Sequence, residues 1–302
     1  MIPPVVRVCE MGPRDGLQNE RATISTPEKI RYIDLLTESG LPLIEPTSFV
    51  SPRAIPQLAD AAEVFAGIHK RPGTRYPVLT PNVRGLERAK AAGADAVAVF
   101  TAASEAFTKR NINMTIDESL DTFTDVVRNA KANAMWVRGY VSTAFGSPFG
   151  DVVTPQAVVD VSRRLLDMGC DEISIGDTIG VGVPSQVDEL IPMIVREIPA
   201  ERIALHFHDT RGTALANVYA ALQHGIAIFD SSSGGLGGCP YAPGATGNLG
   251  TEDLLYMLQG MGIETGVDLD KVRAASRFIA SVLDHDLTSK TYQALERAVT
   301  PA

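Results

Sequence analysis

The chain has 302 residues, of which 45% are hydrophobic and 21% are charged, and its formal net charge is −9. These values are typical of a soluble globular protein with a sizeable core. No apolar run approaches the roughly 20 residues of a membrane helix. No segment concentrates Lys and Arg, which argues against binding to nucleic acid or to a membrane surface. An anionic small-molecule substrate is still permitted, because it needs only a locally basic pocket.

The cysteines and the amino terminus indicate a reducing compartment. Cys9, Cys170 and Cys239 are widely spaced and odd in number, so they form neither a disulfide framework nor a zinc-binding pattern. The first ten residues lack the basic region and long apolar stretch of a signal peptide and the Arg and Ser richness of a transit peptide. We therefore expect a cytoplasmic location.

Short β-branched runs alternate along the chain with amphipathic stretches of helical length. The predicted strands span residues 5–10, 42–46, 76–80, 95–100, 136–142, 171–177, 202–209 and 227–232. Eight strands, each followed by a helix, predict a closed parallel α/β barrel, the TIM (β/α)₈ fold. A doubly wound open sheet also alternates strands and helices, but it usually has fewer strands.

The helical segments begin and end with recognisable signals. Residues 26–40 place Thr26 as N-cap, Pro27 at the first helical position and Gly40 as the stop. The segments 154–169 and 183–198 repeat this order of signals. We expect a single barrel domain over residues 1–302. Its last part, 268–302, is predicted to be a helical tail, because residues 268–299 hold two further helical patterns and no strand.

Two histidines fall at the end of the seventh predicted strand. Active sites of this fold lie at the carboxyl ends of the strands, and residues i and i+2 of a strand project to the same face. His206 and His208 therefore point together into the barrel mouth, where they can bind one metal ion. The alternative is a pair of core histidines held by hydrogen bonds. His69, His224 and His285 lie in helices or connections and are interpreted as structural.

The remaining ligands must come from other strand ends. The first strand ends at Glu10 and runs into a polar loop that includes Arg14, Asp15 and Gln18. An ordinary polar turn with an internal ion pair is the alternative interpretation. After strand eight comes a long glycine-rich loop that contains Cys239 and Asn248 but no phosphate-binding glycine motif. A loop with a reactive thiol is favoured there over a loop with an inert one.

Four segments resemble the 3-hydroxy-3-methylglutaryl-CoA lyase family. They are EMGPRDGLQNE (10–20), GDTIGVG (176–182), HFHDT (206–210) and GGLGGCPYAPGATGNLGTEDLLYML (234–258). The R-D-G-x-Q and H-x-H motifs are shared by a wider group of metal-dependent aldolase-like barrels, which includes isopropylmalate and homocitrate synthases. GPRDGLQNE and GGCPYAPGATGNLGTED are more specific to the lyase, and the similarity runs from about residue 6 to 290.

The resemblance implies a role for each polar residue of the site. Mg²⁺ or Mn²⁺ would be bound by Asp15, His206, His208 and Asn248. Arg14 would contact the substrate carbonyl and Cys239 would act as an acid/base residue. Other polar positions of the family's site are matched by Glu10, Glu45, Asp177 and Glu252, and Gln18 belongs to the same motif.

The implied reaction is the divalent-cation-dependent cleavage of 3-hydroxy-3-methylglutaryl-CoA to acetoacetate and acetyl-CoA. Four protein ligands leave two octahedral positions for the hydroxyl and carboxylate of a 3-hydroxy acid. A base removes the hydroxyl proton, the C2–C3 bond breaks, and Arg14 stabilises the thioester enolate. Cys239 then protonates the enolate carbon. Glu10, Asp177 and His206 are all candidates for the base.

Three other functions remain open at this stage. The chain could be a lyase for a related 3-hydroxyacyl-CoA, since one methylene in a pocket changes binding by only about 1–3 kcal/mol. A Claisen-type synthase in the same barrel group is disfavoured, because such synthases commonly add a regulatory domain. A catalytically inactive binding module is disfavoured by the intact set of polar residues. The expected partners are an acyl-CoA substrate and a second copy of the chain in a homodimer.

Overall fold

The computed structural model describes residues 1–18, 20–238, 247–283 and 285–299. Within these residues, eight parallel strands form one sheet in the order β2-β1-β8-β7-β6-β5-β4-β3. The strands are β1 (Arg7–Glu10), β2 (Leu43–Ile44), β3 (Val78–Leu79), β4 (Ala96–Ala102), β5 (Trp136–Ser142), β6 (Glu172–Asp177), β7 (Ile203–Phe207) and β8 (Ile228–Ser231). Each of the eight predicted strands is confirmed; six are shorter than predicted, β5 matches its predicted bounds, and β4 runs two residues further, to Ala102.

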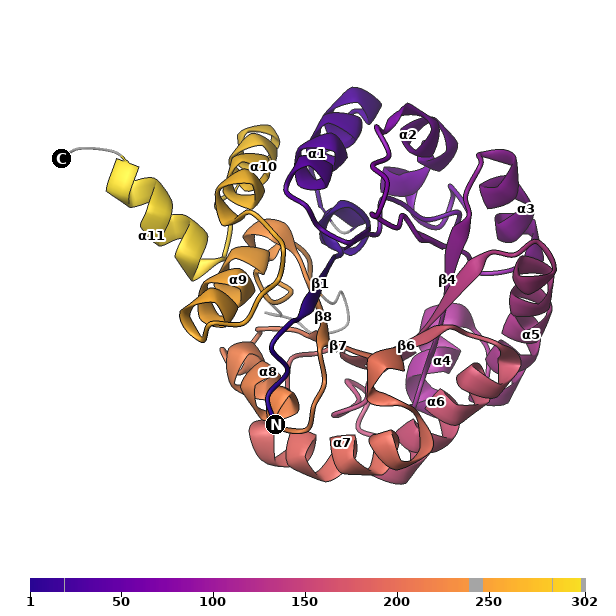
Figure 1. The fold of residues 1–302 in the computed structure, drawn as a ribbon. Helices are drawn as coiled ribbons and strands as arrows, with labels where there is room; N and C mark the ends of the chain where they lie inside the picture. The colour runs from indigo at the N-terminus through magenta and orange to yellow at the C-terminus, as the bar shows by residue number, and fades with distance from the viewer. Residues whose placement is uncertain (19, 239–246, 284, 300–302) are drawn as a thin grey trace.

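The first and last strands of this sheet order meet and close it into a barrel. The backbone N–H of Ile44 donates to the carbonyl of Arg75 over 3.0 Å, and that of Leu79 donates to Thr47 over 3.2 Å. These bonds join the β2 and β3 regions, and a further bridge pairs Ser48 with Leu79. The (β/α)₈ prediction is therefore confirmed, and Figure 1 shows the ring of helices around the strands.

The helices cover the outside of the barrel and supply most of its core packing. They are α1 (Thr26–Glu38), α2 (Ala61–Gly67), α3 (Val83–Ala91), α4 (Glu105–Ile112), α5 (Ile116–Ala132), α6 (Pro155–Met168), α7 (Pro184–Glu197), α8 (Ala214–Gln223), α9 (Thr251–Gly260), α10 (Leu269–Val282) and α11 (Lys290–Val299). The predicted helices at 154–169 and 183–198 are confirmed. Thr154 caps α6 as expected, and Gly169 ends it in the left-handed conformation.

The expected N-cap of α1 is wrong by one residue. Ser25, not Thr26, accepts the backbone N–H of Glu28, and the Glu28 side chain accepts the N–H of Ser25. This reciprocal capping box satisfies two otherwise unpaired donors. Thr26 is instead the first helical residue, and its hydroxyl donates to Asp60.

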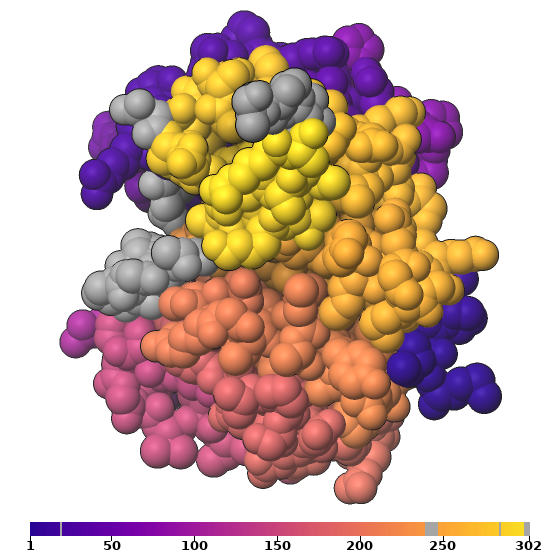
Figure 2. All heavy atoms as spheres, turned by 90° about the vertical axis from the view of Figure 1, so that its left-hand side faces the viewer, coloured from indigo at the N-terminus to yellow at the C-terminus, as the bar shows by residue number. Residues whose placement is uncertain are grey.

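The carboxyl-terminal segment is helical, as predicted. α10 packs against α1 and α9, and α11 packs against α9 on the outside of the barrel. Figure 2 shows α11, in yellow, lying across this face. The assignment of residues 1–302 to one domain stays a prediction. In the described part of the chain, no helix combines the length and apolar character needed to cross a bilayer.

Two separate groups of buried residues fill the structure. The larger group lies between strands and helices, and a smaller group that includes Cys9, Ala98 and Ile228 lines the inside of the barrel. Polar side chains share this interior with the smaller group. Arg138 and Asp230, for example, are buried and bonded to each other, although they lie on β5 and β8.

Candidate active site

Arg14 and Asp15 lie in a π-helical turn, Gly12–Gly16, that directly follows β1. A Cβ at Gly12 would lie 2.5 Å from Tyr32 Oη and 2.6 Å from Glu10 Oε1, so a larger residue would have to displace these two side chains. The tight turn brings Arg14 and Asp15 to the carboxyl end of the barrel. Arg14 is 8% exposed and donates from Nη1 to Asp15 Oδ1 over 2.8 Å.

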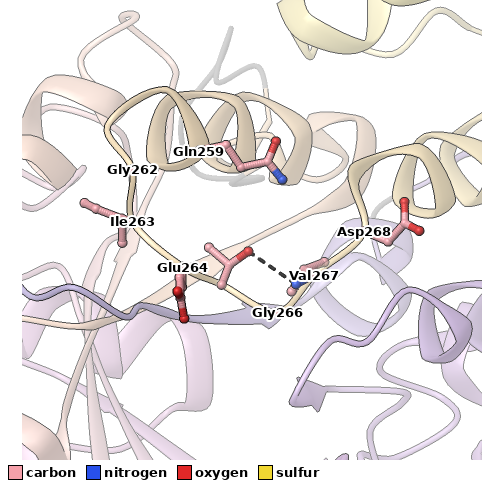
Figure 3. A pocket seen from close by; sticks show the side chains of 8 residues that line it. Gln259, Gly262, Ile263, Glu264, Gly266, Val267 and Asp268 are labelled. Carbon is pink, nitrogen blue, oxygen red and sulfur yellow. Dashed lines mark hydrogen bonds between the residues drawn. The ribbon is translucent and has the colours of Figure 1, made fainter.

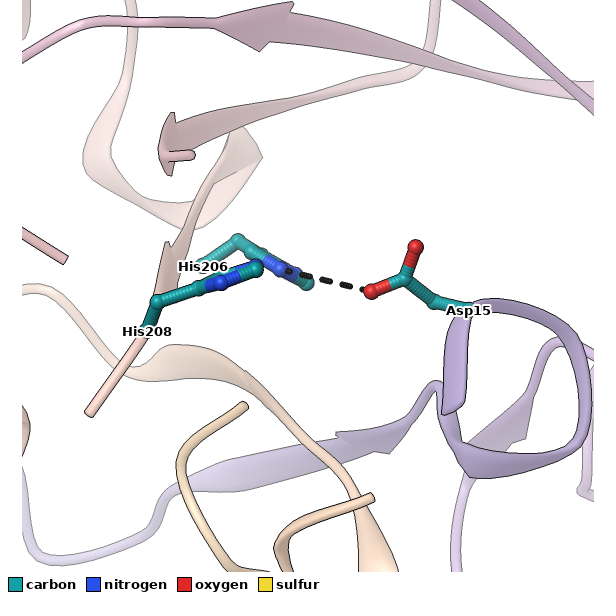
Figure 4. Close-up of side chains that lie close together, drawn as sticks. All are labelled: Asp15, His206 and His208. Atoms are coloured by element: carbon teal, nitrogen blue, oxygen red, sulfur yellow. Dashed lines mark ion pairs between the residues drawn. The ribbon is translucent and has the colours of Figure 1, made fainter. Parts of the chain in front are cut away.

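Asp15 faces the two histidines predicted to bind a metal. His206 lies in β7 and His208 follows its last residue, and their ring centroids are 5.2 Å apart. Ligand atoms of Asp15, His206 and His208 all lie within 4.8 Å of one another, which is close enough to hold one ion. Figure 4 shows the carboxylate pointing toward the two imidazoles. The predicted juxtaposition of these three residues is therefore observed.

The protonation states of Asp15 and His208 suit metal binding, which requires ionised carboxylates and neutral imidazoles. Burial opposes the charge on Asp15, but the adjacent Arg14 guanidinium outweighs it, and the pKa of Asp15 falls to about 2. Burial, reinforced by the neighbouring His206, lowers the pKa of His208 to about 4. At neutral pH these two groups present unshared electron pairs.

Asn248 lies against the same cluster. Residue 248 forms an antiparallel bridge with His208, and its Nδ2 donates to Asp15 Oδ2 and to the Leu236 carbonyl, each over 2.9 Å. Asn248 Oδ1 and His208 Nδ1 are buried, and neither has a hydrogen-bond partner among the described residues. Unpaired buried acceptors are costly. Carboxylate, amide and imidazole donors with vacant lone pairs fit a divalent cation of the Mg²⁺ or Mn²⁺ type.

Arg14 is held from its other side by Glu45, which follows β2. Nε of Arg14 donates to Glu45 Oε2 over 2.8 Å, and Nη2 lies 2.7 Å from the same oxygen. The hydroxyl of Tyr140 also donates to Glu45 Oε2, over 3.2 Å. The guanidinium therefore has a fixed orientation beside the metal-binding cluster, while N–H groups not used in these contacts can donate to a substrate.

A buried charge network below the cluster was not anticipated. Arg138 Nη2 donates to Asp230 Oδ1 over 2.6 Å, and its Nε lies 3.0 Å from Glu172 Oε1. Asp230 Oδ2 accepts from Ser174 over 2.9 Å and lies 3.3 Å from His206 Nδ1. Burial raises the pKa of Asp230, but the Arg138 charge outweighs it and the pKa is lowered overall. The network thus ends on His206, a residue of the candidate metal-binding cluster.

Glu10 and Glu252 are buried but do not belong to the cluster. Glu10 accepts hydrogen bonds from the backbone N–H groups of Gly12 and Ser233, and from the hydroxyl of Thr251. Glu252 accepts from Gly234 N and from the Ser276 hydroxyl. Burial raises the pKa of Glu10 to about 8 and that of Glu252 to about 7. Both carboxyl groups therefore bind the start of the glycine-rich loop, at Ser233 and Gly234, by hydrogen bonds.

Asp177 has a similar local role at the end of β6. Its oxygens accept the backbone N–H groups of Val181 and Gly182 over 3.0 and 2.9 Å, and burial raises its pKa to about 6. Gln18 is half-buried just after the π-helical turn. Cys239 lies outside the described residues.

The other three histidines contact carboxylates away from the cluster. His69 pairs with Asp34, His224 with Asp188 and His285 with Glu20. These contacts agree with the structural interpretation of all three.

A surface hollow also exists at the opposite end of the barrel. It is lined by the segment between α9 and α10, residues 262–268, together with Gln259 (Figure 3). Glu264 in this segment pairs with the chain just before β1, which places the hollow at the amino ends of the strands. In this fold that end contributes to stability, not to catalysis. The candidate active site is therefore the cluster at the carboxyl ends.

Comparison with known proteins gives a consistent family assignment. The HMGL-like family model matches residues 5–279. The mitochondrial hydroxymethylglutaryl-CoA lyase of Bos taurus is 54% identical over 292 residues, which covers 97% of this chain and 90% of the relative. The crystal structure of hydroxymethylglutaryl-CoA lyase from Pseudomonas aeruginosa superposes with a TM-score of 0.96 at 51% identity, covering 99% of both chains.

A third relative was solved with ligands. The HMG-CoA lyase from Acinetobacter baumannii, in complex with coenzyme A and 3-methylmalate, has a TM-score of 0.94 at 38% identity and covers 99% of this chain and 98% of its own. Family model, sequence relatives and solved structures agree over nearly the full length. The chain belongs to the HMGL-like family, with the hydroxymethylglutaryl-CoA lyases as its relatives.

Proposed function

We propose that this chain cleaves 3-hydroxy-3-methylglutaryl-CoA to acetoacetate and acetyl-CoA with the help of a divalent cation. The observation that carries the proposal is the cluster of Asp15, His206 and His208 beside a fixed Arg14, at the carboxyl ends of the strands. The names of the full-length relatives give the substrate and the reaction. The coenzyme A complex of the Acinetobacter relative supports an acyl-CoA as the partner.

Asp15, His206, His208 and Asn248 are the proposed cation ligands. Three of them offer ligand atoms within 4.8 Å of one another. Asn248 adds an unpaired buried oxygen, and its amide nitrogen donates to Asp15. A cation bound there would supply Lewis acidity toward the hydroxyl and carboxylate oxygens of the substrate. Mg²⁺ and Mn²⁺ are the preferred candidates because the donor set contains no thiolate.

Arg14 is assigned to the charge that forms when the C2–C3 bond breaks. A base takes the proton of the C3 hydroxyl, the C3–O bond becomes the ketone of acetoacetate, and the electron pair of the broken C2–C3 bond moves into the thioester, whose oxygen becomes negative. A guanidinium already oriented by Glu45 and Asp15 can donate to this oxygen without reorganising, which is the property of an efficient oxyanion donor. Cys239 is assigned to deliver a proton to the enolate carbon.

Glu10 and Asp177 are better suited to positioning than to proton transfer. Both carboxylates already accept backbone N–H groups of neighbouring loops, and neither belongs to the metal-binding cluster. Glu10 holds together the turn that carries Arg14 and the start of the loop that carries Cys239. We assign Glu252 the same kind of role.

The cellular setting of the enzyme is proposed from the sequence. Curated relatives include forms named mitochondrial and forms named cytoplasmic, with similar identity to this chain. We retain the cytoplasmic location and the homodimer as predictions.

Removal of the cation should abolish activity. EDTA treatment is expected to eliminate cleavage of 3-hydroxy-3-methylglutaryl-CoA, and Mg²⁺ or Mn²⁺ should restore it. His208→Ala should weaken Mn²⁺ binding, measured by the EPR signal of free Mn²⁺, more than it weakens binding of free coenzyme A. His224→Ala is the matched control, because His224 pairs with Asp188 at the surface. Full turnover by protein shown to be metal-free would contradict this assignment.

Replacement of Arg14 should lower kcat. Arg14→Gln is expected to lower kcat by about 10²–10³-fold with little change in KM, because the interaction forms only in the transition state. Arg14→Lys should also lower kcat strongly, since an ammonium group cannot reproduce the planar set of hydrogen bonds that the guanidinium makes to Glu45 and Asp15. Arg128→Gln, on the exposed face of α5, is the control and should behave as wild type.

Steady-state kinetics separate the two possible roles of Arg14. A large rise in KM with kcat intact would show that Arg14 anchors the substrate and does not stabilise the enolate.

Cys239 should transfer a proton without forming a covalent intermediate. Cys239→Ser is expected to fold, to bind Mn²⁺ as wild type does, and to lose most of its kcat, because a hydroxyl is a far weaker acid than a thiol. Iodoacetamide should inactivate the wild type and spare the residual activity of Cys239→Ser. Burial raises the pKa of Cys9 to about 11 and that of Cys170 to about 12, so neither should react near neutral pH.

Two results would reject this role. One is near-normal turnover in Cys239→Ser, and the other is an acyl adduct on Cys239 in mass spectra of enzyme quenched during turnover.

A further inference from the structure

We propose that Asp230 is a positioning residue for the metal-binding cluster. Held by Arg138 and Ser174, it fixes the tautomer and orientation of His206 so that Nε2 presents its lone pair toward Asp15. The inference rests on the proposed function, because it presupposes that the cluster binds a cation.

The two ring nitrogens of His206 have different neighbours. Nδ1 lies 3.3 Å from Asp230 Oδ2, and Nε2 lies 3.9 Å from Asp15 Oδ2. An ionised carboxylate can only accept a hydrogen bond, and a neutral imidazole carries one N–H group. The bond to Asp230 therefore places the proton on Nδ1 and leaves Nε2 unprotonated, as a metal ligand requires.

Asp230 can impose this state because it is itself immobilised. Asp230 is buried in β8, and it lies directly opposite His206 on the neighbouring strand β7. Arg138 on β5 donates to Oδ1 over 2.6 Å, and Ser174 on β6 donates to Oδ2 over 2.9 Å. Side chains from three strands thus converge on a carboxylate carried by a fourth, and each strand is fixed by the hydrogen bonds of the barrel.

His208 differs from His206, because no carboxylate within the described residues is bonded to a ring nitrogen of His208. The pre-arranged ligand of the pair is therefore His206, and its geometry depends on Asp230. A carboxylate that orients a metal-bound histidine usually contributes a factor of about 10–100 to metal affinity.

Asp230→Asn is the informative variant. Because Arg138 can only donate, the amide oxygen should turn toward Arg138 and the amide nitrogen toward His206. His206 Nδ1 would then accept a hydrogen bond, and the proton would move to Nε2, where it blocks metal binding. We expect the dissociation constant for Mn²⁺, measured by EPR, to rise by about 10–100-fold.

Nitrogen-15 NMR of the histidine side chains tests the same idea without any metal. At a pH of about 9, where imidazole is mostly neutral, the Nδ1–H tautomer of His206 is expected in the wild type and the Nε2–H tautomer in Asp230→Asn. Ser174→Ala keeps the carboxylate charge and should keep the Nδ1–H tautomer. The wild-type spectrum alone decides the question if Asp230→Asn does not fold.

Asp60→Asn is the matched control for loss of a partly buried ion pair. Asp60 pairs with Lys29 between α1 and α2, outside the strand barrel, over 2.8 Å. This variant should lower thermal stability and leave the Mn²⁺ affinity unchanged.

The outcomes separate this inference from the proposed function. An Nε2–H tautomer of His206 in the wild type, or wild-type Mn²⁺ affinity in a folded Asp230→Asn, would overturn the role of Asp230 and leave the lyase assignment intact. Wild-type protein that binds no Mn²⁺ would overturn both.

Discussion

Arg138 carries a positive charge into the strand barrel, where its side chain is fully buried. Such a charge is tolerated only with close partners, and removing one partner of a buried pair typically costs about 3–5 kcal/mol. Asp230 and Glu172 supply them. From Arg138, contacts run through Asp230 to His206 and through Tyr140 and Glu45 to Arg14. His206, a proposed metal ligand, and Arg14, the proposed charge-stabilising residue, are therefore both connected to one guanidinium through side-chain contacts.

The barrel and the outline of the site follow from local sequence patterns. Alternation of short strands with capped helices predicts the fold, because each segment carries its own start and stop signals. His206, His208 and Asp15 could be brought together in advance, since parallel strands place their carboxyl ends at one rim. Asn248 could be assigned as a ligand only through the family resemblance, because a long loop separates it from the end of β8 and its position depends on the course of that loop.

It was harder to predict which side chains of a strand point into the barrel. Arg138 and Tyr140 alternate with Val137, Gly139 and Val141, and Glu172 and Ser174 alternate with isoleucine, a pattern that indicates polar side chains inside the barrel. The sequence could not show that Glu10 connects two loops through hydrogen bonds. Its carboxylate accepts from Ser233 and Thr251, which are more than two hundred residues away in the chain. Such long-range contacts have no local sequence signature.

An anomalous difference map from crystals grown with Mn²⁺ would test the central claim most directly. The account predicts one strong Mn²⁺ peak among Asp15, His206 and His208, coordinated by His206 through Nε2 while Nδ1 stays bonded to Asp230. Absence of a peak at this position in active crystals, or a peak bound elsewhere in the barrel, would contradict the assignment of the cation site.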